Sequence, residues 1–137
     1  MSAWNDINKT IYDKLSGDGT LTGMLASGTP IYYMQAPDAQ TYPFVVFSWQ
    51  AGTDGNETPR REKDMILWAR AYTTSGPAQA GSIDARIDTL INGQTLTVNS
   101  WTNFWTAREQ DISLVENLPD NNKVYTAGGM YRIRISK

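Results

Sequence analysis

The chain has 137 residues, 40% hydrophobic and 11% aromatic, which is the size of one domain with enough apolar side chains for a buried core. Twelve basic against fourteen acidic side chains give a net charge of -2, which disfavours general nucleic-acid binding through whole-chain charge. Cysteine and histidine are absent, and this excludes disulfides, thiolate metal sites, cysteine nucleophiles and the commonest general base.

The first predicted element is an amphipathic helix near the N-terminus. Its apolar residues recur at spacings of three and four, which is one face of a helix: Trp4, Ile7, Ile11 and Leu15. We expect Ser2 to cap its start and Gly17 to end it in a left-handed turn. In the Gly- and Thr-rich stretch that follows, Leu21, Met24 and Leu25 are expected to fold a short helical turn back on the core.

Two apolar segments in the middle of the chain are predicted to pair as a β-hairpin. The stretch "TYPFVVFSWQ" (41–50) is apolar on both faces of any strand, and Pro43 lies at its beginning, where a missing amide does least harm. The side chains of "DMILWARAY" (64–72) alternate between two faces, with Ile66, Trp68, Arg70 and Tyr72 on one and Met65, Leu67, Ala69 and Ala71 on the other. The polar residues between the strands predict a long hairpin tip.

A second helix is predicted over about 77–91, because Pro77 suits a first helical turn and "NG" at 92–93 suits its end. Its apolar face consists of Ala80, Ile83, Ile87, Leu90 and Ile91. Asp84, Arg86 and Asp88 are left for solvent or a partner. Gly81 costs about 1 kcal/mol against alanine inside a helix, and close packing on the sheet is the reason that we expect for it.

The last third of the chain is predicted to be extended. "QTLTVNSWTNFWTAR" contains strand-forming residues, and the final segment alternates strictly between Tyr131, Ile133 and Ile135 on one face and Arg132, Arg134 and Ser136 on a wet one. The order of elements indicates an α+β fold, a largely antiparallel β-sheet with two α-helices packed on one face. We expect residues 1–137 to form this as one domain.

The sequence offers no catalytic pattern. A serine or threonine nucleophile would need a lysine or carboxylate base, and no serine-x-x-lysine or glycine-x-serine-x-glycine pattern supplies one. "SGDGT" and "TDGNET" lack the lysine of a phosphate loop and the spaced acids of a calcium loop. We therefore expect no enzyme, no catalytic residue, no cofactor and no metal. No apolar run of about 18 residues and no signal peptide is present, so we expect a soluble protein on the cytoplasmic side.

The five tryptophans and seven tyrosines have three interpretations. They can pack in the core, form a stacking platform for sugar or single-stranded nucleic acid, or lie in a protein interface. Helices cover only one face of the predicted sheet, yet "FVVFSW" and "MILWAR" carry large apolar groups on both faces. The second face therefore needs a cover, from the chain's own C-terminal segments or from a neighbouring subunit.

The order of segments carries a resemblance. An amphipathic N-terminal helix is followed by "GTPIYYMQAPDAQTYPFVVFS", a polar loop, "MILWARAYT" leading into "AQAGSIDARIDTLING", and a closing "KVYTAGGMYRIRIS". This succession resembles the tail completion proteins of long-tailed phages, which include tail terminators and neck proteins. The most telling parts are Ile31 to Phe47 and Leu67 to Leu90. The chain departs from the pattern in the longer, Trp-containing segment Val98 to Asp111, which leaves the number of strands there open.

The resemblance implies a structural virion protein, assembled in the host cytoplasm and located in the tail or neck. Such proteins form rings, commonly six-fold, that end growth of the tail tube at its head-proximal end and join it to the head connector. The implied partners are further copies of the chain in a hexamer, the tail tube protein and a head connector or neck protein; no membrane is involved. DNA would pass through without specific binding, and a net charge of -2 is compatible with that because a strongly basic lumen would hold phosphates.

A hypothesis for the interface follows from the hairpin. One face of its strands would meet the helices and the other a subunit boundary, while the polar loop 51–63 would project toward the tail tube or head connector. The interface residues expected on this basis are Trp49, Glu57, Arg60, Arg61, Glu62, Lys63, Trp68, Arg70 and Tyr72. A solvated hairpin tip is the simpler alternative for the loop. For the whole chain, the alternatives are another neck component that meets the portal and a monomeric binding module with an aromatic face.

Overall fold

A computed structural model describes residues 3–55 and 61–137 of the chain. In these residues it has three helices, α1 (Ala3–Ser16), α2 (Gly19–Met24) and α3 (Pro77–Ile91). The strands are β1 (Ile31–Tyr33), β2 (Phe44–Asp54), β3 (Glu62–Thr73), β4 (Thr97–Val98), β5 (Trp101–Asn117) and β6 (Lys123–Ser136).

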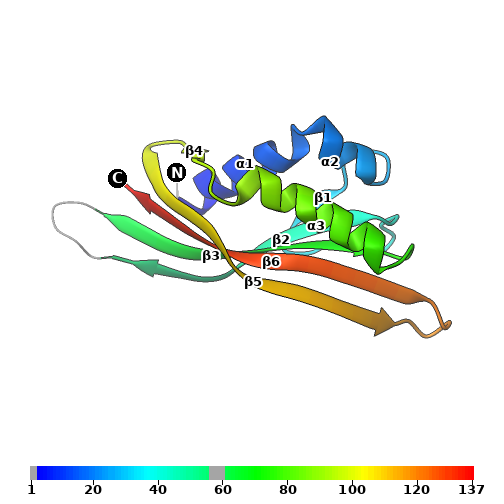
Figure 1. Ribbon diagram of the computed structural model, residues 1–137. Coiled ribbons are helices and arrows are strands. Elements are labelled where there is room, and N and C mark those ends of the chain that lie inside the picture. Colours follow the sequence, from blue (N-terminus) through cyan, green and yellow to red (C-terminus); the bar gives the residue numbers. More distant parts are fainter. Residues whose placement is uncertain (1–2, 56–60) are drawn as a thin grey trace.

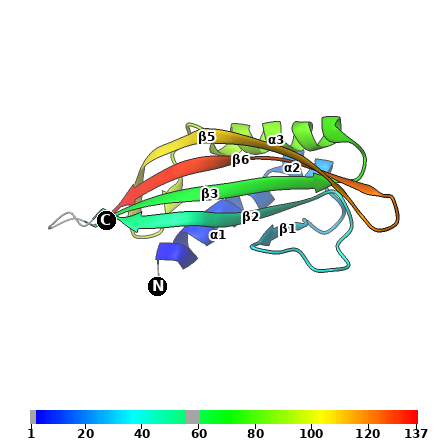
Figure 2. The same cartoon turned by 90° about the horizontal axis from the view of Figure 1, so that it is seen from below.

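The six strands form one sheet in the order β1-β2-β3-β6-β5-β4. All neighbouring strands are antiparallel except β1 and β2, which are parallel. Figure 1 shows the helices together on one face of the sheet, and Figure 2 shows the other face without a helix. The predicted α+β class is therefore confirmed. A third helix, α2, stands where a helical turn was expected; the Asp18 carboxylate caps it by accepting from the Leu21 amide at 2.8 Å.

The core lies between the helices and the sheet. The predicted apolar faces are confirmed, because α1 buries Ile7, Ile11 and Leu15 and α3 buries Ala80, Ile83, Ile87 and Ile91. Trp4 and Leu90 pack at the margin of the core. The sheet contributes fully or almost fully buried side chains from three strands: Val45, Phe47, Met65, Leu67, Ala69, Ala71, Tyr131, Ile133 and Ile135. The apolar faces predicted from the helical period of 3.6 residues and the strand period of two residues thus pack against each other in one layer.

Two glycines have roles other than those expected. Gly17 ends α1, but it is not among the glycines of positive φ in the described residues. Its amide donates to the Asp13 carbonyl oxygen at 2.9 Å, and a Cβ there would lie 2.8 Å from that oxygen. Gly81 was expected to pack closely on the sheet, which is wrong, because a Cβ at this position would meet no heavy atom within 4 Å. The predicted cap, Ser2, lies outside the described residues.

The central hairpin has longer strands and a shorter connection than the sequence indicated. β2 continues to Asp54 and β3 begins at Glu62, so only residues 55–61 join them. Thr53 pairs with Asp64 and Asp54 with Lys63, which makes these polar residues part of the ladder. A polar composition does not end a strand when the main chain still finds a partner. Pro43 directly precedes β2, as expected.

The segment between Val98 and Asp111 contains the end of β4 and most of one long strand, β5, which settles the open strand count. Its pairing with β6 is irregular between Asn103 and Trp105 and between Arg108 and Gln110, so two residues bulge out of the ladder. The alternation on β6 holds for Tyr131, Ile133 and Ile135, which are buried, and for Arg132 and Arg134, which are half-buried on the other face. Ser136 is buried and not wet, unlike the prediction.

One end of the β5–β6 hairpin extends beyond the rest of the sheet. β3 ends at Thr73, opposite Tyr125, so residues 115–124 have no β3 partner; we call this segment the arm. It projects at the right of Figure 1, away from β4 and the N-terminal end of α1. Leu114 and Val115, at the base of the arm, are 52% and 55% exposed.

Candidate assembly surfaces

The face of the sheet without helices is a candidate surface for contact with other proteins, and we call it the open face. Its central residues alternate along β3 with the side chains buried under the helices: Asp64, Ile66, Trp68, Arg70 and Tyr72. Their cross-strand neighbours complete it, with Phe44, Val46 and Ser48 on β2 and Thr126, Gly128, Met130, Arg132 and Arg134 on β6. The predicted division of β3 into two faces is confirmed.

The chain covers one half of the open face with its own aromatic side chains. The Phe44 ring is 8% exposed and lies 5.1 Å from the ring of Tyr72, 5.0 Å from Tyr42 and 6.3 Å from Tyr32. Burial raises the pKa of the Tyr72 hydroxyl above its ordinary value. Phe44, an apolar side chain of β2 on this face, is therefore covered by aromatic groups from β1, β3 and the segment before β2.

Three buried polar atoms on the open face have no hydrogen-bond partner among the described residues. They are Trp68 Nε1, Arg70 Nε and Thr126 Oγ1. The Arg70 guanidinium lies 3.9 Å from the centre of the Trp68 ring, a close cation–π contact. Buried polar atoms of folded proteins are almost always paired, and an unpaired one costs about 1–3 kcal/mol. Their location on one face favours this region as a surface that another molecule completes.

The other half of the open face carries paired charges. Arg132 donates to Asp64 at 2.7 Å and to Glu109 at 2.9 Å, and both hydrogen bonds raise the pKa of its guanidinium, the bond to Glu109 most. Arg134 lies 3.9 Å from Glu62. Charges that are satisfied within one subunit contribute little to raw affinity, but they select the orientation of a partner.

The predicted interface residues fall into separate groups. Trp68, Arg70 and Tyr72 lie together on the open face, as expected. Trp49 lies on the helix side, where its ring is 5.4 Å from that of Trp4 and its Nε1 donates to Asn8. The following irregularity in β2, between Trp49 and Ala51, is a bulge that the sequence did not reveal.

The charged part of the predicted loop sits at the end of the hairpin. Arg61 and Lys63 both pair with Asp54, at 3.2 and 2.7 Å, and Glu62 faces Arg134. Glu57 and Arg60 lie outside the described residues. The described members therefore form a compact group of mixed charge at the end of the sheet opposite the arm.

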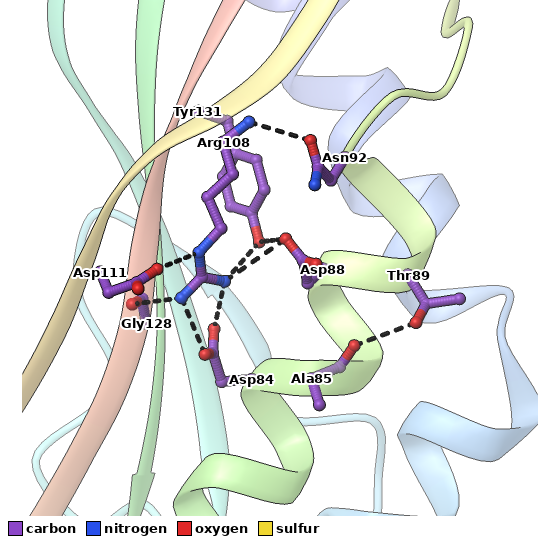
Figure 3. A network of polar contacts seen from close by, with 9 residues as sticks. All are labelled: Asp84, Ala85, Asp88, Thr89, Asn92, Arg108, Asp111, Gly128 and Tyr131. Atoms are coloured by element: carbon purple, nitrogen blue, oxygen red, sulfur yellow. Dashed lines mark hydrogen bonds and ion pairs between the residues drawn. The ribbon is translucent and has the colours of Figure 1, made fainter.

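A polar network that the sequence did not predict ties α3 to the sheet (Figure 3). The Arg108 guanidinium donates to both oxygens of Asp84 at 2.9 Å, to the Gly128 carbonyl and the Tyr131 hydroxyl at 3.0 Å, and to Asp111 at 2.6 Å. Burial alone would lower the pKa of Arg108, but the hydrogen bonds to Asp84 and Asp111 raise it overall. A Cβ on the neighbouring Gly129 would lie 2.6 Å from the guanidinium carbon, so glycine makes room for it.

The network corrects the expectation that the charged residues of α3 serve solvent or a partner. Asp84 binds Arg108, Asp88 accepts from the Tyr131 hydroxyl at 3.3 Å, and Arg86 binds Asp18 at 2.7 and 2.8 Å. All three stabilise the subunit itself. The only signal for this in the sequence was the spacing of Asp84 and Asp88, which places both carboxylates on one side of a helix.

Acid should weaken the attachment of α2 to α3. The hydrogen bond from Arg86 lowers the pKa of Asp18 to about 2, from an ordinary 3.8. Because the pKa of Asp18 is lower in the folded protein than in the unfolded chain, the ion pair stabilises the fold above about pH 4. This stabilisation is lost as the pH falls through about 2. Asp18→Asn keeps an N-cap side chain but loses the charge, and it should cost about 1 kcal/mol at neutral pH. Urea unfolding from pH 7 to 2 should show the two proteins converging in acid; a constant difference would contradict the prediction.

Residues 3–55 and 61–137 contain neither a candidate metal site nor a candidate membrane span. No cluster of three or more acidic side chains there is placed to hold a metal ion. None of the helices in these ranges has the length and hydrophobicity needed to cross a membrane.

The chain was compared with protein families, curated proteins and solved structures, and similarity was found among the solved structures. No protein-family profile and no curated protein matches the chain. Among solved structures, the fold is similar to a chain of one described as "Virion of native gene transfer agent (GTA) particle", with a TM-score of 0.81 at 14% sequence identity. The match covers 99% of this chain and 98% of that chain. At this identity the likeness shows a shared fold over nearly the whole length of both chains.

Proposed function

We propose that this chain is a structural protein of a phage-like virion and has no enzymatic activity. The observation that carries the proposal is the match over 99% of the chain to a protein of a gene transfer agent virion. The sequence supports it independently, because the order of its segments resembles that of the tail completion proteins. The absence of histidine and cysteine from the sequence fits an assembly role better than a catalytic one.

Within the virion, we propose that the protein is a tail completion or terminator protein. Copies of the chain would form a ring, a hexamer, at the head-proximal end of the tail tube, end its growth and join it to the head connector. DNA would pass through without specific binding. The unpaired buried polar atoms of Trp68, Arg70 and Thr126 support a subunit boundary on the open face, because a neighbouring subunit can supply the missing partners.

The second surface in this proposal is the end of the β2–β3 hairpin. Arg61, Glu62 and Lys63 are held there by pairing with Asp54 and Arg134. In the proposal they contact the tail tube protein or the head connector, together with Glu57 and Arg60. Mixed charges suit a joint that must select one partner and one orientation.

The second candidate is a different neck component, such as a head completion or adaptor protein that meets the portal. The matched structure supports it equally, because its description names a whole virion. Twelve-fold assembly or direct binding to a portal would favour this function over the tail terminator.

The native mass over a concentration series, measured by light scattering after size exclusion, is the first test. A discrete ring with the mass of six subunits supports the tail terminator, and a twelve-subunit ring supports the portal-contacting alternative. A monomer would mean that the ring requires the tail tube, and mixing with purified tube protein would then be the deciding measurement. No association with tube, connector or further copies would contradict the proposal.

The hairpin end is tested by a triple substitution, with Arg60, Arg61 and Lys63 replaced by alanine. We expect a folded subunit with impaired joining, since ion pairs at a protein surface contribute about 1 kcal/mol or less each to stability but select partners. The matched control changes Arg60 and Arg61 to lysine and Lys63 to arginine, which retains every charge. Counting joined particles by electron microscopy distinguishes them. Normal joining by the alanine variant would remove this surface from the proposal.

A further inference from the structure

A cleft of about 720 Å³ separates α1 from the segment that joins α3 to β5. Its lining residues come from both sides: Asp6, Lys9, Thr10, Asp13 and Lys14 from α1, and Thr95, Leu96, Thr97 and Asn99 from the connection. A hydrogen bond of 2.9 Å from the Thr10 hydroxyl to the Thr97 carbonyl oxygen ties the two walls together. The cleft lies outside the open face and the hairpin end, so it belongs to neither surface described above.

Asp6 is the unusual residue of this cleft. It is 6% exposed, and its carboxylate makes no hydrogen bond or ion pair within the part of the chain that the structure describes. The Thr10 hydroxyl donates to the main-chain oxygen of Asp6, not to its carboxylate. The nearby Lys9 is engaged with Asp13. A position in the first turn of a helix favours an acid but supplies no counter-ion for it.

An unpaired, nearly buried carboxylate that lines a cleft calls for a cation. The cations without an ion pair among residues 3–55 and 61–137 are Lys14, Arg70, Lys123 and Lys137. Arg70 lies over the Trp68 ring and Lys137 over the Trp101 ring. Lys14 lines the same cleft without reaching Asp6. Lys123 remains, and it lies on the arm, where it has no ion pair among the described residues.

The arm matches the cleft in other respects. Its acids Glu116 and Asp120 form no ion pair in the described structure, and neither does Lys14 at the cleft. Leu114 and Val115, exposed at the base of the arm, supply apolar area that a contact can bury. Docking of an arm in a cleft would therefore pair Lys123 with Asp6. It would also bring Glu116 and Asp120 near Lys14, and remove Leu114 and Val115 from water.

We propose that the arm of one subunit docks in the α1 cleft of the next, with the Lys123 ammonium at the Asp6 carboxylate. The arm projects from the end of the sheet away from β4 and the N-terminal end of α1 (Figure 1), whereas residues of α1 and β4 line the cleft, so one subunit cannot satisfy itself and the contact is head-to-tail. Head-to-tail contacts close into rings when the rotation permits. The inference rests on the proposed self-association and adds the arm and the α1 cleft to the open face as elements that make it.

The absence of cysteine from the chain allows a direct test. A double variant with Asn99→Cys at the cleft and Asn122→Cys on the arm is treated with a flexible bis-maleimide cross-linker. A head-to-tail contact should give a ladder of covalent oligomers, because each subunit then links to two neighbours. An equal mixture of the two single variants should give dimers only. If the wild-type protein forms a ring but the double variant gives no ladder, this inference falls and the proposed ring stands.

Substitution of Asp6 separates a binding role from a structural one. Asp6→Asn in the double-cysteine background should lower the ladder yield by about tenfold or more, because loss of one member of a buried charge pair weakens a contact by at least that factor. The isolated subunit should unfold at the same urea concentration, because the Asp6 carboxylate has no hydrogen bond or ion pair to lose among the described residues. A lower unfolding midpoint with an unchanged ladder would show that Asp6 has an internal partner and would overturn the inference.

Two substitutions of Lys123, one that removes its charge and one that keeps it, test the other side of the contact. Lys123→Gln should lower the ladder yield as much as Asp6→Asn does, and Lys123→Arg should retain it, since arginine also satisfies a carboxylate. Equal ladders from both variants would show that the charge of Lys123 is not used. A chain that gives no ladder at any concentration, either alone or mixed with purified tube protein, would overturn this inference, while the virion role would still be decided by the particle-joining assay.

Discussion

Replacing Arg108 by methionine is expected to lower the free energy of unfolding by about 3–5 kcal/mol, the range for breaking a buried ion pair by removal of one partner. The Arg108 side chain is 14% exposed and Asp84 is 17% exposed, so solvent replaces the lost interaction poorly. The substitution also removes donors from the Gly128 carbonyl and the Tyr131 hydroxyl. Asp111 adds little to this cost, because its side chain is 84% exposed.

Two companion variants identify the source of the effect. Arg108→Lys keeps the charge but loses the two parallel bonds to Asp84, so it should also destabilise, by a smaller amount. Asp111→Asn should change stability by less than about 1 kcal/mol. Urea denaturation followed by tryptophan fluorescence measures all three. If Arg108→Met proves as stable as the wild type, the network does not hold α3 on the sheet.

Gly128→Ala is the second substitution with a large expected cost. A Cβ at this position would lie 2.3 Å from the Ala69 carbonyl oxygen and 3.0 Å from the Arg70 Cα, both on the adjacent strand β3. Main-chain atoms cannot move aside as the end of a flexible side chain can, so β3 and β6 would have to separate. Overpacking of this kind typically costs about 1–3 kcal/mol and occasionally more, and we expect the upper end because the displaced atoms are backbone.

Gly81→Ala is the matched control, with the same change in a helix. No heavy atom lies within 4 Å of the added Cβ there, so the gain in helix propensity is unopposed. This variant should be more stable by about 1 kcal/mol. Thermal unfolding of both variants against the wild type tests the pair. A neutral Gly128→Ala would show that β3 and β6 are farther apart than described.

The arrangement of these elements also bears on assembly. Gly128 and Arg108 lie where α3 is fastened to the sheet, because Arg108 binds both Asp84 and the Gly128 carbonyl oxygen. Variants at these positions should therefore lose assembly through lost stability, whereas Asp6→Asn and the hairpin-end variants should lose it while the subunit stays folded. Measuring unfolding and oligomer mass on the same samples separates these two causes.

The elements best predicted from the sequence were those with a strong local period. Ile7, Ile11 and Leu15 occur at helical spacing and are all fully buried. Pro77 and the "NG" after Ile91 mark the observed bounds of α3. The alternation of β3 correctly separated Trp68, Arg70 and Tyr72 from the core side of the sheet. Each of these predictions depends on the geometry of one element and its nearest neighbours in the chain.

The features that the sequence did not indicate depend on residues far apart in the chain. β1 is three residues long and is a strand only because it lies beside Val45–Phe47. Trp49 was grouped with Trp68, but a bulge follows it and its side chain belongs to the helix side. Arg108 lies 24 residues from Asp84 and was not recognised as its partner.

The sequence by itself determined the α+β class, the two main helices, the inward faces of β3 and β6, and the resemblance to tail completion proteins. Periodicity and residue order suffice for these because side-chain direction repeats along a single element. Only the tertiary structure decided which charges are satisfied within the subunit and which are left for a partner. Asp84, Asp88 and Asp6 are all helix acids in the sequence. The first two meet side chains from the sheet, whereas the Asp6 carboxylate lines a cleft and has no partner in the part of the chain that the structure describes. Pairing depends on distance in space, and packing sets that distance.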